Sequence, residues 1–238
     1  STLAPAGSRI VRVSSTMLAP AQSRPDETEA EAATAFLQRR GAAEATFNVA
    51  TLTELTARTV YANGLSGTFR QIAYEVRTPQ GARDGRAYTM QYDPDSQRFA
   101  LRAARVHRRD GGVQEGTQVQ EFSSTSDPSA RMYFNNRVVQ VTFPDLRPGD
   151  VVELQWRVDD VSPRNAFADY FGDFQFIQAN VPRERWRYVL RSPSAREMFV
   201  HVASLPGGRA VTASTRAEGD VSVRTWSADS VPAVAPED

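Results

Sequence analysis

Two stretches between residues 138 and 158 alternate apolar and polar side chains with a period of two, and this pattern constrains the fold most. Their apolar positions are Val139, Val141 and Phe143 in the first and Val152, Leu154, Trp156 and Val158 in the second. Such alternation gives a β-strand one apolar face, so Trp156 is expected to face a core. Between the stretches, Pro148-Gly149 suits the centre of a type II turn. The sequence therefore predicts an antiparallel hairpin that is half-buried against a second layer.

Further alternating stretches follow one another from about residue 56 to residue 226, with turn signals such as Asn63-Gly64 between them. One stretch shifts its alternation by one residue near Ala103, which indicates a β-bulge. Two later strands are predicted over residues 174–177 and 199–203. Helices do not alternate with these strands, and no repeat of fixed length is present. We expect an all-β fold, an antiparallel β-sandwich of about ten short strands.

The N-terminal part of the chain lacks this pattern. Residues 1–22 are expected to form a loose arm or a strand that pairs with a neighbour. One helix is predicted over about residues 23–40, because acidic side chains gather at its start and arginines at its end. A further helical turn is expected within residues 50–57. The predicted organisation is a short N-terminal helical arm at residues 1–55, followed by a β-sandwich domain at residues 56–238.

Composition excludes several classes of protein. The 28 basic and 28 acidic side chains give no net charge, whereas nucleic-acid binders normally carry a basic excess. The chain has no cysteine, so disulfides and thiolate zinc sites are excluded. No apolar run approaches the ~20 residues that a membrane-spanning helix needs. We therefore expect neither a nucleic-acid partner nor a membrane span.

The chain lacks the residue combinations that nucleophilic catalysis usually needs. Only two histidines are present, His107 beside a predicted turn and His201 within a predicted strand. There is neither a cysteine nor a Gly-x-Ser-x-Gly motif. Structural roles for both histidines are the favoured interpretation. We predict no catalytic residue, no metal and no cofactor.

Acidic side chains gather around residues 159–173. Asp159, Asp160, Asp169 and Asp173 could together bind Ca2+ or supply a carboxylate pair for hydrolysis. The chain has no Asp-x-Asp-x-Asp-Gly loop, and several arginines follow at residues 183–187. Solvated charges or Asp–Arg pairs are therefore the favoured interpretation. A hydrolase built on Asp169 and Asp173 stays the weaker alternative.

Five aromatic side chains fall within ten residues of the same region: Phe167, Tyr170, Phe171, Phe174 and Phe176. We expect Phe174 and Phe176 to belong to the core, because they lie where a strand is predicted to resume. Tyr170 and Phe171 fall in the preceding loop, and loops often carry binding residues. The sequence therefore offers a candidate partner-binding surface formed by Arg164, Asp169, Tyr170, Phe171 and Asp173. A role of the aromatic rings in the core or in anchoring the loop is the alternative.

The order of several short motifs resembles a known family. Residues 133–137 read Tyr-Phe-Asn-Asn-Arg, and residues 141–154 read Val-Thr-Phe-Pro-Asp-Leu-Arg-Pro-Gly-Asp-Val-Val-Glu-Leu. A Phe-Gln-Phe motif with a proline shortly after it follows, and the likeness covers roughly residues 55–238. This combination resembles a bacterial domain of unknown function that commonly precedes a transglutaminase-like domain of the papain type in cell-envelope proteins.

The resemblance implies a fold and a context more than a chemistry. We expect a non-catalytic accessory domain that docks or positions a transglutaminase-like or protease-like partner, in a bacterial envelope or periplasmic protein. That partner is a downstream domain of the same chain or another envelope protein. A module that binds carbohydrate or another envelope polymer is the alternative. An aromatic row exposed on one sheet face would favour sugar binding, and two buried carboxylates in a cleft would favour the hydrolase.

Overall fold

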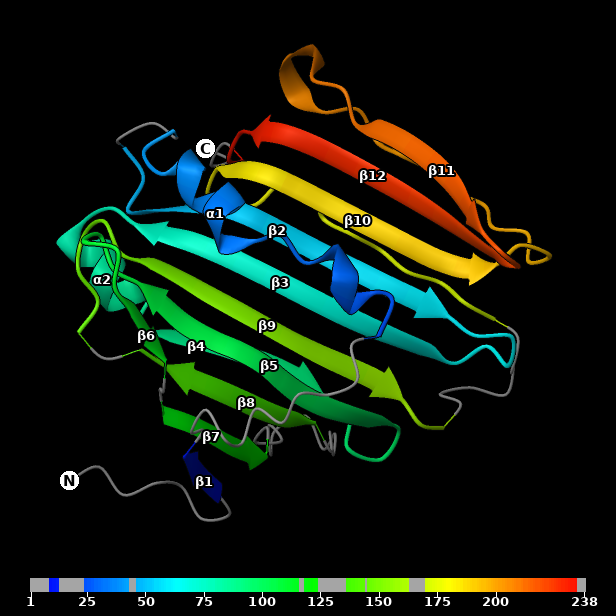
Figure 1. Ribbon diagram of the computed structural model, residues 1–238, viewed down its shortest axis with the longest axis horizontal. Helices are drawn as coiled ribbons and strands as arrows, with labels where there is room; N and C mark the ends of the chain where they lie inside the picture. Colours follow the sequence, from blue (N-terminus) through cyan, green and yellow to red (C-terminus); the bar gives the residue numbers. More distant parts are fainter. Residues whose placement is uncertain are drawn as a thin grey trace, which may run out of the picture.

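The computed structural model describes residues 9–12, 24–42, 46–115, 118–123, 136–143, 145–162 and 170–234, with only the backbone described at 9–12. Most of these residues form strands of two sheets (Figure 1). The larger sheet has the order β11-β12-β10-β2-β3-β9-β5-β6 and the smaller sheet β1-β7-β8-β4. The larger sheet comprises β2 (Val49–Val60), β3 (Ser66–Val76), β5 (Gln97–His107), β6 (Val113–Glu115), β9 (Val151–Asp160), β10 (Arg183–Pro193), β11 (Thr212–Glu218) and β12 (Val221–Val231). The smaller sheet comprises β1 (Arg9–Arg12), β4 (Ala87–Tyr92), β7 (Gln118–Ser123) and β8 (Arg137–Thr142).

The apolar alternation that predicts the strands also builds the core between the two sheets. Leu154 and Trp156 of β9 pack with Tyr74 of β3 against Met90 and Val141 of the smaller sheet, and all five are buried. Removing this apolar surface from water is the main favourable contribution to folding. The predicted all-β sandwich is confirmed, and Trp156 faces the core as expected.

The predicted hairpin between residues 138 and 158 is wrong, although both of its strands exist. β8 pairs with β4 and β7 in the smaller sheet, whereas β9 pairs with β3 and β5 in the larger one. The turn is as predicted, since the Asp150 N–H donates to the Arg147 carbonyl at 3.0 Å and Gly149 has a φ of 94°. A strand with one apolar face fits a sandwich equally well beside its neighbour or across the core from it. Only packing against the rest of the chain selects between the two.

Two other local signals are confirmed, and one long-range pairing is new. Gly64 has a φ of 80° in the turn that joins β2 to β3. The pairing of β5 with β9 shifts between Leu101 and Ala103, where the bulge is predicted. β2 and β10 form a parallel pair within an otherwise antiparallel sheet. No local sequence pattern indicates that pair, because the two strands are far apart in the chain.

Residues 24–42, called the strap from here on, lie across the face of the larger sheet that points away from the smaller sheet (Figure 1). The helix predicted over residues 23–40 is broken into η1 (Glu27–Glu29), α1 (Ala33–Phe36) and η2 (Leu37–Arg39). The helical turn predicted within 50–57 is wrong, because β2 begins at Val49 and crosses the predicted domain boundary. Two other short helices, α2 (Pro79–Asp84) and η3 (Pro206–Gly208), lie in connections. No helix in the described ranges is long and apolar enough to span a membrane.

Ion pairs explain why the strap follows the sheet instead of forming one straight helix. Asp26 pairs with Arg157 of β9 at 2.7 Å, and both side chains are buried. Glu27 pairs with Arg102 at 3.0 Å, and Glu29 pairs with Arg187 at 2.7 Å. Removing one partner of a buried pair is strongly destabilising, because the remaining charge stays desolvated. The acidic side chains that predict a helix start thus act as contacts to the arginines of the sheet.

Candidate functional site

The smaller sheet leaves one half of the larger sheet uncovered. In that half, β10 and β12 carry four buried side chains on the face that elsewhere meets the smaller sheet: Trp186, Tyr188, Leu190 and Trp226. Two segments outside helices and strands, 170–178 and 196–205, lie over these side chains. The four side chains, which form the groove floor, and the two segments together line an open groove of about 1040 Å3. It is called the apolar groove from here on.

The rims of the apolar groove carry exposed aromatic rings. Phe174 is 75% exposed, Phe176 is 72% exposed and Phe199 is 88% exposed. The rings of Phe174 and Phe176 meet edge to face, with their centroids 4.7 Å apart. Single exposed apolar side chains are ordinary, but a contiguous apolar patch usually marks an interaction site. The apolar groove is therefore the strongest candidate for a binding surface in the described part of the chain.

Asp173 fixes the first of the two segments onto the sheet. Its carboxylate accepts a hydrogen bond from the Tyr188 hydroxyl at 2.8 Å and pairs with Arg58 at 3.3 Å. Burial and the neighbouring Asp173 carboxylate raise the pKa of Tyr188 well above its usual range. Tyr188 therefore stays protonated and acts as the donor. This arrangement holds Asp173 within the domain rather than presenting it to a partner.

Arg183 and a residue that follows β12 hold the second part of the 170–178 segment and the residue after it in place. The Arg183 guanidinium donates to the carbonyls of Phe176 and Ile177 at 2.6 Å each. The Val234 N–H donates to the Ala179 carbonyl at 2.7 Å. Buried backbone groups need partners, and here a side chain and a neighbouring segment supply them in place of a strand. The backbone that carries Phe174 and Phe176 is thus fixed while their rings point into solvent.

The predicted binding residues divide into four groups. Tyr170 is 66% exposed and lines the apolar groove, as expected for a binding residue. Phe171 is half-buried against the groove floor, and the Arg58 guanidinium lies over its ring at 5.7 Å from the centroid. Asp173 is engaged in the internal contacts described above. Arg164 and Asp169 lie outside the described residues.

Two predictions for this region are wrong. Phe174 and Phe176 are exposed rather than part of the core, and residues 174–177 form no strand. Residues 199–203 form no strand either, and they line the groove. Alternation with a period of two arises in any extended segment, whether or not a partner strand exists. The density of aromatic residues was the one sequence signal for this surface, and it did not reveal that the second segment joins it.

The two histidines lie on opposite faces of the larger sheet. His201 is exposed and lines the apolar groove. His107 is buried beneath the strap, with its Nε2 atom 2.9 Å from a carboxylate oxygen of Glu153 and its ring edge-on to Phe36. Burial by itself raises the pKa of Glu153, but hydrogen bonds from His107, Gln155 and Gln71 outweigh it and lower that pKa overall. This arrangement serves the attachment of the strap.

Of the four acidic residues that could form a site, the three that the structure describes do not converge. Asp159 pairs with Arg157 at 2.8 Å on the strap side of the sheet. Asp160 accepts hydrogen bonds from the backbone N–H and the hydroxyl of Ser66. Asp173 lies by the apolar groove, paired with Arg58. Among the described residues, no three His, Asp or Glu side chains are close enough together to hold a metal ion.

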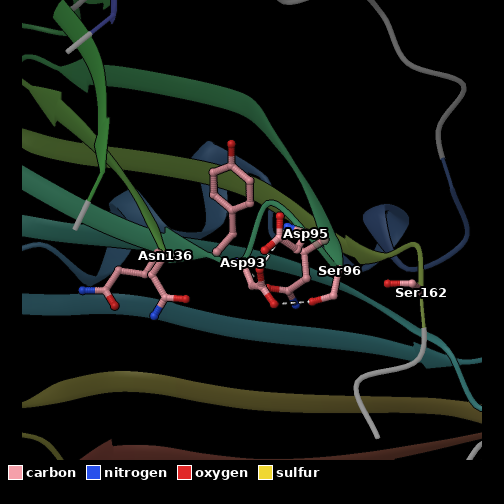
Figure 2. Close-up of a pocket in the computed structure, with 8 residues that line it drawn as sticks. Asp93, Asp95, Ser96, Asn136 and Ser162 are labelled. Carbon is pink, nitrogen blue, oxygen red and sulfur yellow. Dashed lines mark hydrogen bonds between the residues drawn. The ribbon is translucent and has the colours of Figure 1, made fainter. Parts of the chain in front are cut away.

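A second cavity of about 610 Å3 lies at the turn between β4 and β5 and is polar (Figure 2). The Asp93 carboxylate accepts hydrogen bonds from the Asp95 N–H at 3.0 Å and the Ser96 hydroxyl at 2.6 Å. Asn136 and Ser162 lie on either side of this turn (Figure 2). The Asp93 carboxylate thus stabilises the turn itself, which is a common role for Asp at such positions.

Most of the chain matches one known protein family in sequence. Residues 62–235 match a family described as a domain of unknown function with a solved structure, DUF3857. No curated protein matches the chain in sequence. The matched residues include the apolar groove and most strands of both sheets, and they leave out β1, the strap and β2.

Solved structures add a likeness of fold. A candidate protease from Parabacteroides distasonis superposes with a TM-score of 0.62 at 14% identity, over 80% of this chain and 37% of that chain. An M1 zinc metallopeptidase from Deinococcus radiodurans gives a TM-score of 0.40 at 14% identity, over 76% of this chain and 39% of that chain. A family 3a carbohydrate-binding module from the cipA scaffolding of Clostridium thermocellum gives 0.30 at 15% identity, over 56% and 91%. At 14% identity, the first structure shows a likeness of fold alone. The other two have TM-scores of 0.40 and 0.30, which are too low to carry an argument. The chain spans well under half the length of the first two proteins.

Proposed function

This chain belongs to the DUF3857 family, and we propose that it is a non-catalytic accessory domain that docks another domain of the same polypeptide through the apolar groove. The observation that carries this proposal is the cluster of exposed phenylalanines on a fixed backbone. Phe174, Phe176 and Phe199 expose large apolar rings to water at the rims of one groove. Covering such rings at an interface is favourable, because apolar surface leaves water.

The fixed backbone beneath the rings makes them suitable as interface anchors. Interface energy is concentrated in a few desolvated aromatic or arginine side chains. A segment that is already ordered loses little conformational freedom when it binds. The contacts of Asp173 and Arg183 provide this order before any partner arrives. The rings therefore need no rearrangement of the domain to be buried.

The position of the chain after β12 supports a partner within the same polypeptide. Val234 lines the apolar groove, so a segment that follows it begins at the groove's edge. Tethering two binding partners raises their effective concentration and favours docking without any new contact. In the candidate protease of Parabacteroides distasonis, the matching fold makes up 37% of the chain. That protein combines the fold with a longer polypeptide, which is the arrangement proposed here.

The partner we propose is a transglutaminase-like or protease-like domain, in a protein of the bacterial envelope or periplasm. The support for this is the resemblance of the motifs around residues 133–154 to a domain that commonly precedes such domains. The non-catalytic role is supported by the separation of His107 from His201 and, among the described acidic side chains, of Asp159 from Asp173. Catalysis would then belong to the partner, and this domain would position it.

Carbohydrate binding is the second candidate function, and the shape of the surface favours it less. Sugar binding would be favoured by an aromatic row on a sheet face, but the exposed rings belong to two irregular segments. Among the described residues, three of the four most exposed aromatic rings are phenylalanines, which offer no hydrogen-bond donor to a sugar. An envelope polymer nevertheless belongs in the binding test as a competing ligand.

The test is a calorimetric titration of this chain with the domain encoded beside it in the same reading frame. We expect Phe176→Ala to weaken binding by about 1–3 kcal/mol without changing the melting temperature. Val113→Ala is the matched control, because Val113 is exposed on β6, at the opposite edge of the larger sheet. Equal binding of the wild type and the Phe176 variant would contradict docking. Binding of purified peptidoglycan fragments that depends on Phe176 would favour the second candidate.

A further inference from the structure

Residues 199–204, called the raised segment from here on, line the apolar groove and are exposed one after another. Phe199 is 88% exposed, Val200 is 51% exposed and Val202 is 42% exposed. In a strand that rests on a core, every second side chain is buried, because successive side chains point to opposite faces. The raised segment has no such buried face, so apolar side chains on both of its faces are in water.

Both ends of the raised segment are fixed to the groove floor. Met198, directly before it, packs against the buried side chains of the floor. The Met198 carbonyl also accepts a hydrogen bond from Arg224 of β12 at 3.2 Å. Leu205, directly after it, is buried and belongs to the same cluster as the floor. The raised segment is therefore held in place between two anchors, and it runs between them without a turn or bend.

The order of side chains in the raised segment is that of a strand. Residues 199–203 read Phe-Val-His-Val-Ala, and phenylalanine and valine are enriched in strands. This order is the reason that the sequence predicts a strand there. In the folded chain these residues belong to neither of the two described sheets. An apolar, strand-forming sequence thus lies in water at the groove, where it is a template for pairing with another chain segment.

The other segment of the groove, 170–178, is committed to contacts within the domain. The carbonyls of Phe176 and Ile177 accept hydrogen bonds from Arg183 at 2.6 Å each. The Asp173 carboxylate holds the start of the same stretch against the sheet. A partner strand that paired with this backbone would compete with those contacts. The raised segment is therefore the better place for backbone pairing.

We propose that the raised segment becomes a strand when the domain docks, by pairing along its backbone with an extended segment of the partner domain. This rests on the proposed function and deepens it, because it names the form of the partner's contact. In recognition by strand addition, main-chain hydrogen bonds give affinity and alternate side chains give specificity. The partner segment carries apolar side chains at every second position, and these cover Trp186 and Trp226 of the groove floor.

The size of this contact favours a partner in the same polypeptide over a second copy of the chain. The stretch 199–203 is short compared with the about 20–30 residues that each side of a standard interface contributes. A contact of this size is weak between separate molecules, whereas a tether raises the effective concentration of the partner segment. The exposed rings of Phe174 and Phe176 add apolar contact area in the same groove. Strand pairing then fixes the register and direction of the partner segment.

The test measures amide hydrogen exchange, residue by residue with NMR, in the 238-residue chain alone and with the domain encoded beside it in the same reading frame. We expect exchange within residues 199–203 to slow about a hundredfold on binding, and only at alternate residues. The alternation is expected because neighbouring N–H groups of a strand point to opposite edges. A docked helix or loop that merely covers the segment would not produce it.

Proline variants separate backbone pairing from side-chain burial. Val200→Pro and His201→Pro each remove one N–H, and the two N–H groups point to opposite edges of the segment. One of the two variants should bind the partner domain about tenfold more weakly than its matched control, Val200→Ala or His201→Ala, because one hydrogen bond is lost. The other should behave like its control. All four should keep the wild-type melting temperature, since both residues are exposed and lie outside the sheets.

Failure of strand pairing and failure of docking give different results. Binding that depends on Phe176 but leaves exchange within 199–203 unchanged would overturn the inference and leave the docking function standing. Equal effects of the two proline variants would also overturn it. Slowed exchange in the chain alone that increases with its own concentration would make a second copy the occupant. Absence of any binding to the encoded domain would contradict docking, and this inference with it.

Discussion

The two halves of one sheet face are covered in different ways. Over β3, β9 and β5 the cover is a second sheet, whose strands satisfy their own backbone and bury Met90 and Val141 against Trp156. Over β10 and β12 the cover is two irregular segments, whose backbone is fixed by Asp173 and Arg183. The first half buries its aromatic side chains, and the second leaves several of them in water.

This difference shows how a domain can be both stable and available for binding. A paired sheet turns one row of side chains inward, because successive residues alternate between its faces. An extended segment that is held by side-chain contacts has no second sheet against which to bury its rings, and it leaves both Phe174 and Phe176 in water. The covered half therefore stabilises the fold, and the groove half offers the interaction surface.

The largest effects are expected at two of the three buried tryptophans, Trp156 and Trp226. Trp156→Ala should destabilise the chain by about 3–5 kcal/mol in urea denaturation, as large aromatic truncations in a core do. Trp226→Ala should cost less, because the space it leaves opens onto the groove and fills with water. Equal losses would mean that the irregular cover packs as tightly as the second sheet.

The next effect concerns the turn that carries the chain from the smaller to the larger sheet. Gly149→Val should destabilise by about 1–3 kcal/mol, because a β-branched residue resists a φ of 94°. A Cβ at Gly149 would also lie 2.8 Å from the Arg109 Cδ atom. Thermal melting measures the loss, and Gly219→Val is the control, since it has a φ of 63° but open space around it. A smaller loss at Gly149 than at Gly219 would mean that the contact with Arg109 is unimportant.

Acidification should lower the stability of the fold through Glu153, which lies on the face of β9 that the strap covers. The pKa of Glu153 is lowered in the folded chain, so its ionised form stabilises the fold above its ordinary pKa of 4.5. That contribution is lost as pH falls below about 4.5 and through the lowered value. Glu153→Gln should therefore show a shallower decline of stability with acid in denaturant titrations between pH 6 and pH 3. An unchanged dependence of stability on pH would mean that ionisation of Glu153 does not contribute to stability.

The smallest effects are expected in the groove half. Phe174→Ala should change the stability of the isolated chain by less than about 0.5 kcal/mol, as for ordinary surface changes. Tyr170→Ala should behave similarly, whereas the half-buried Phe171 should cost more when truncated. Thermal melts of the three variants check this order. A large fall in melting temperature for Phe174→Ala would place its ring in the core and remove the binding surface.

Local chemistry made much of the sandwich predictable. The bulge near Ala103, the turn at Pro148-Gly149 and the inward face of Trp156 all follow from a few neighbouring residues. The hairpin prediction failed because alternation describes the faces of a strand and not its neighbour. The helix prediction for residues 23–40 failed for a related reason, since the ion partners of Asp26 and Glu29 lie more than a hundred residues away.

The candidate site was predictable only in part. The density of aromatic residues around Tyr170 drew attention to the correct segment, but it assigned Phe174 and Phe176 to the wrong environment. Nothing near Phe199 in the sequence connects it to that segment, and the two meet only because both lie over β10 and β12.

By itself, the sequence determined which residues are extended, which faces are apolar and where the chain turns. These properties depend on the dihedral preferences and polarity of neighbouring residues, which are read directly from their order. The tertiary structure alone decided which strands pair, which half of the sheet receives a second sheet, and which aromatic side chains remain in water. Those outcomes depend on competition among all apolar surfaces of the chain for a limited number of partners. Such a competition is settled by packing over long sequence separations, and no local pattern records its result.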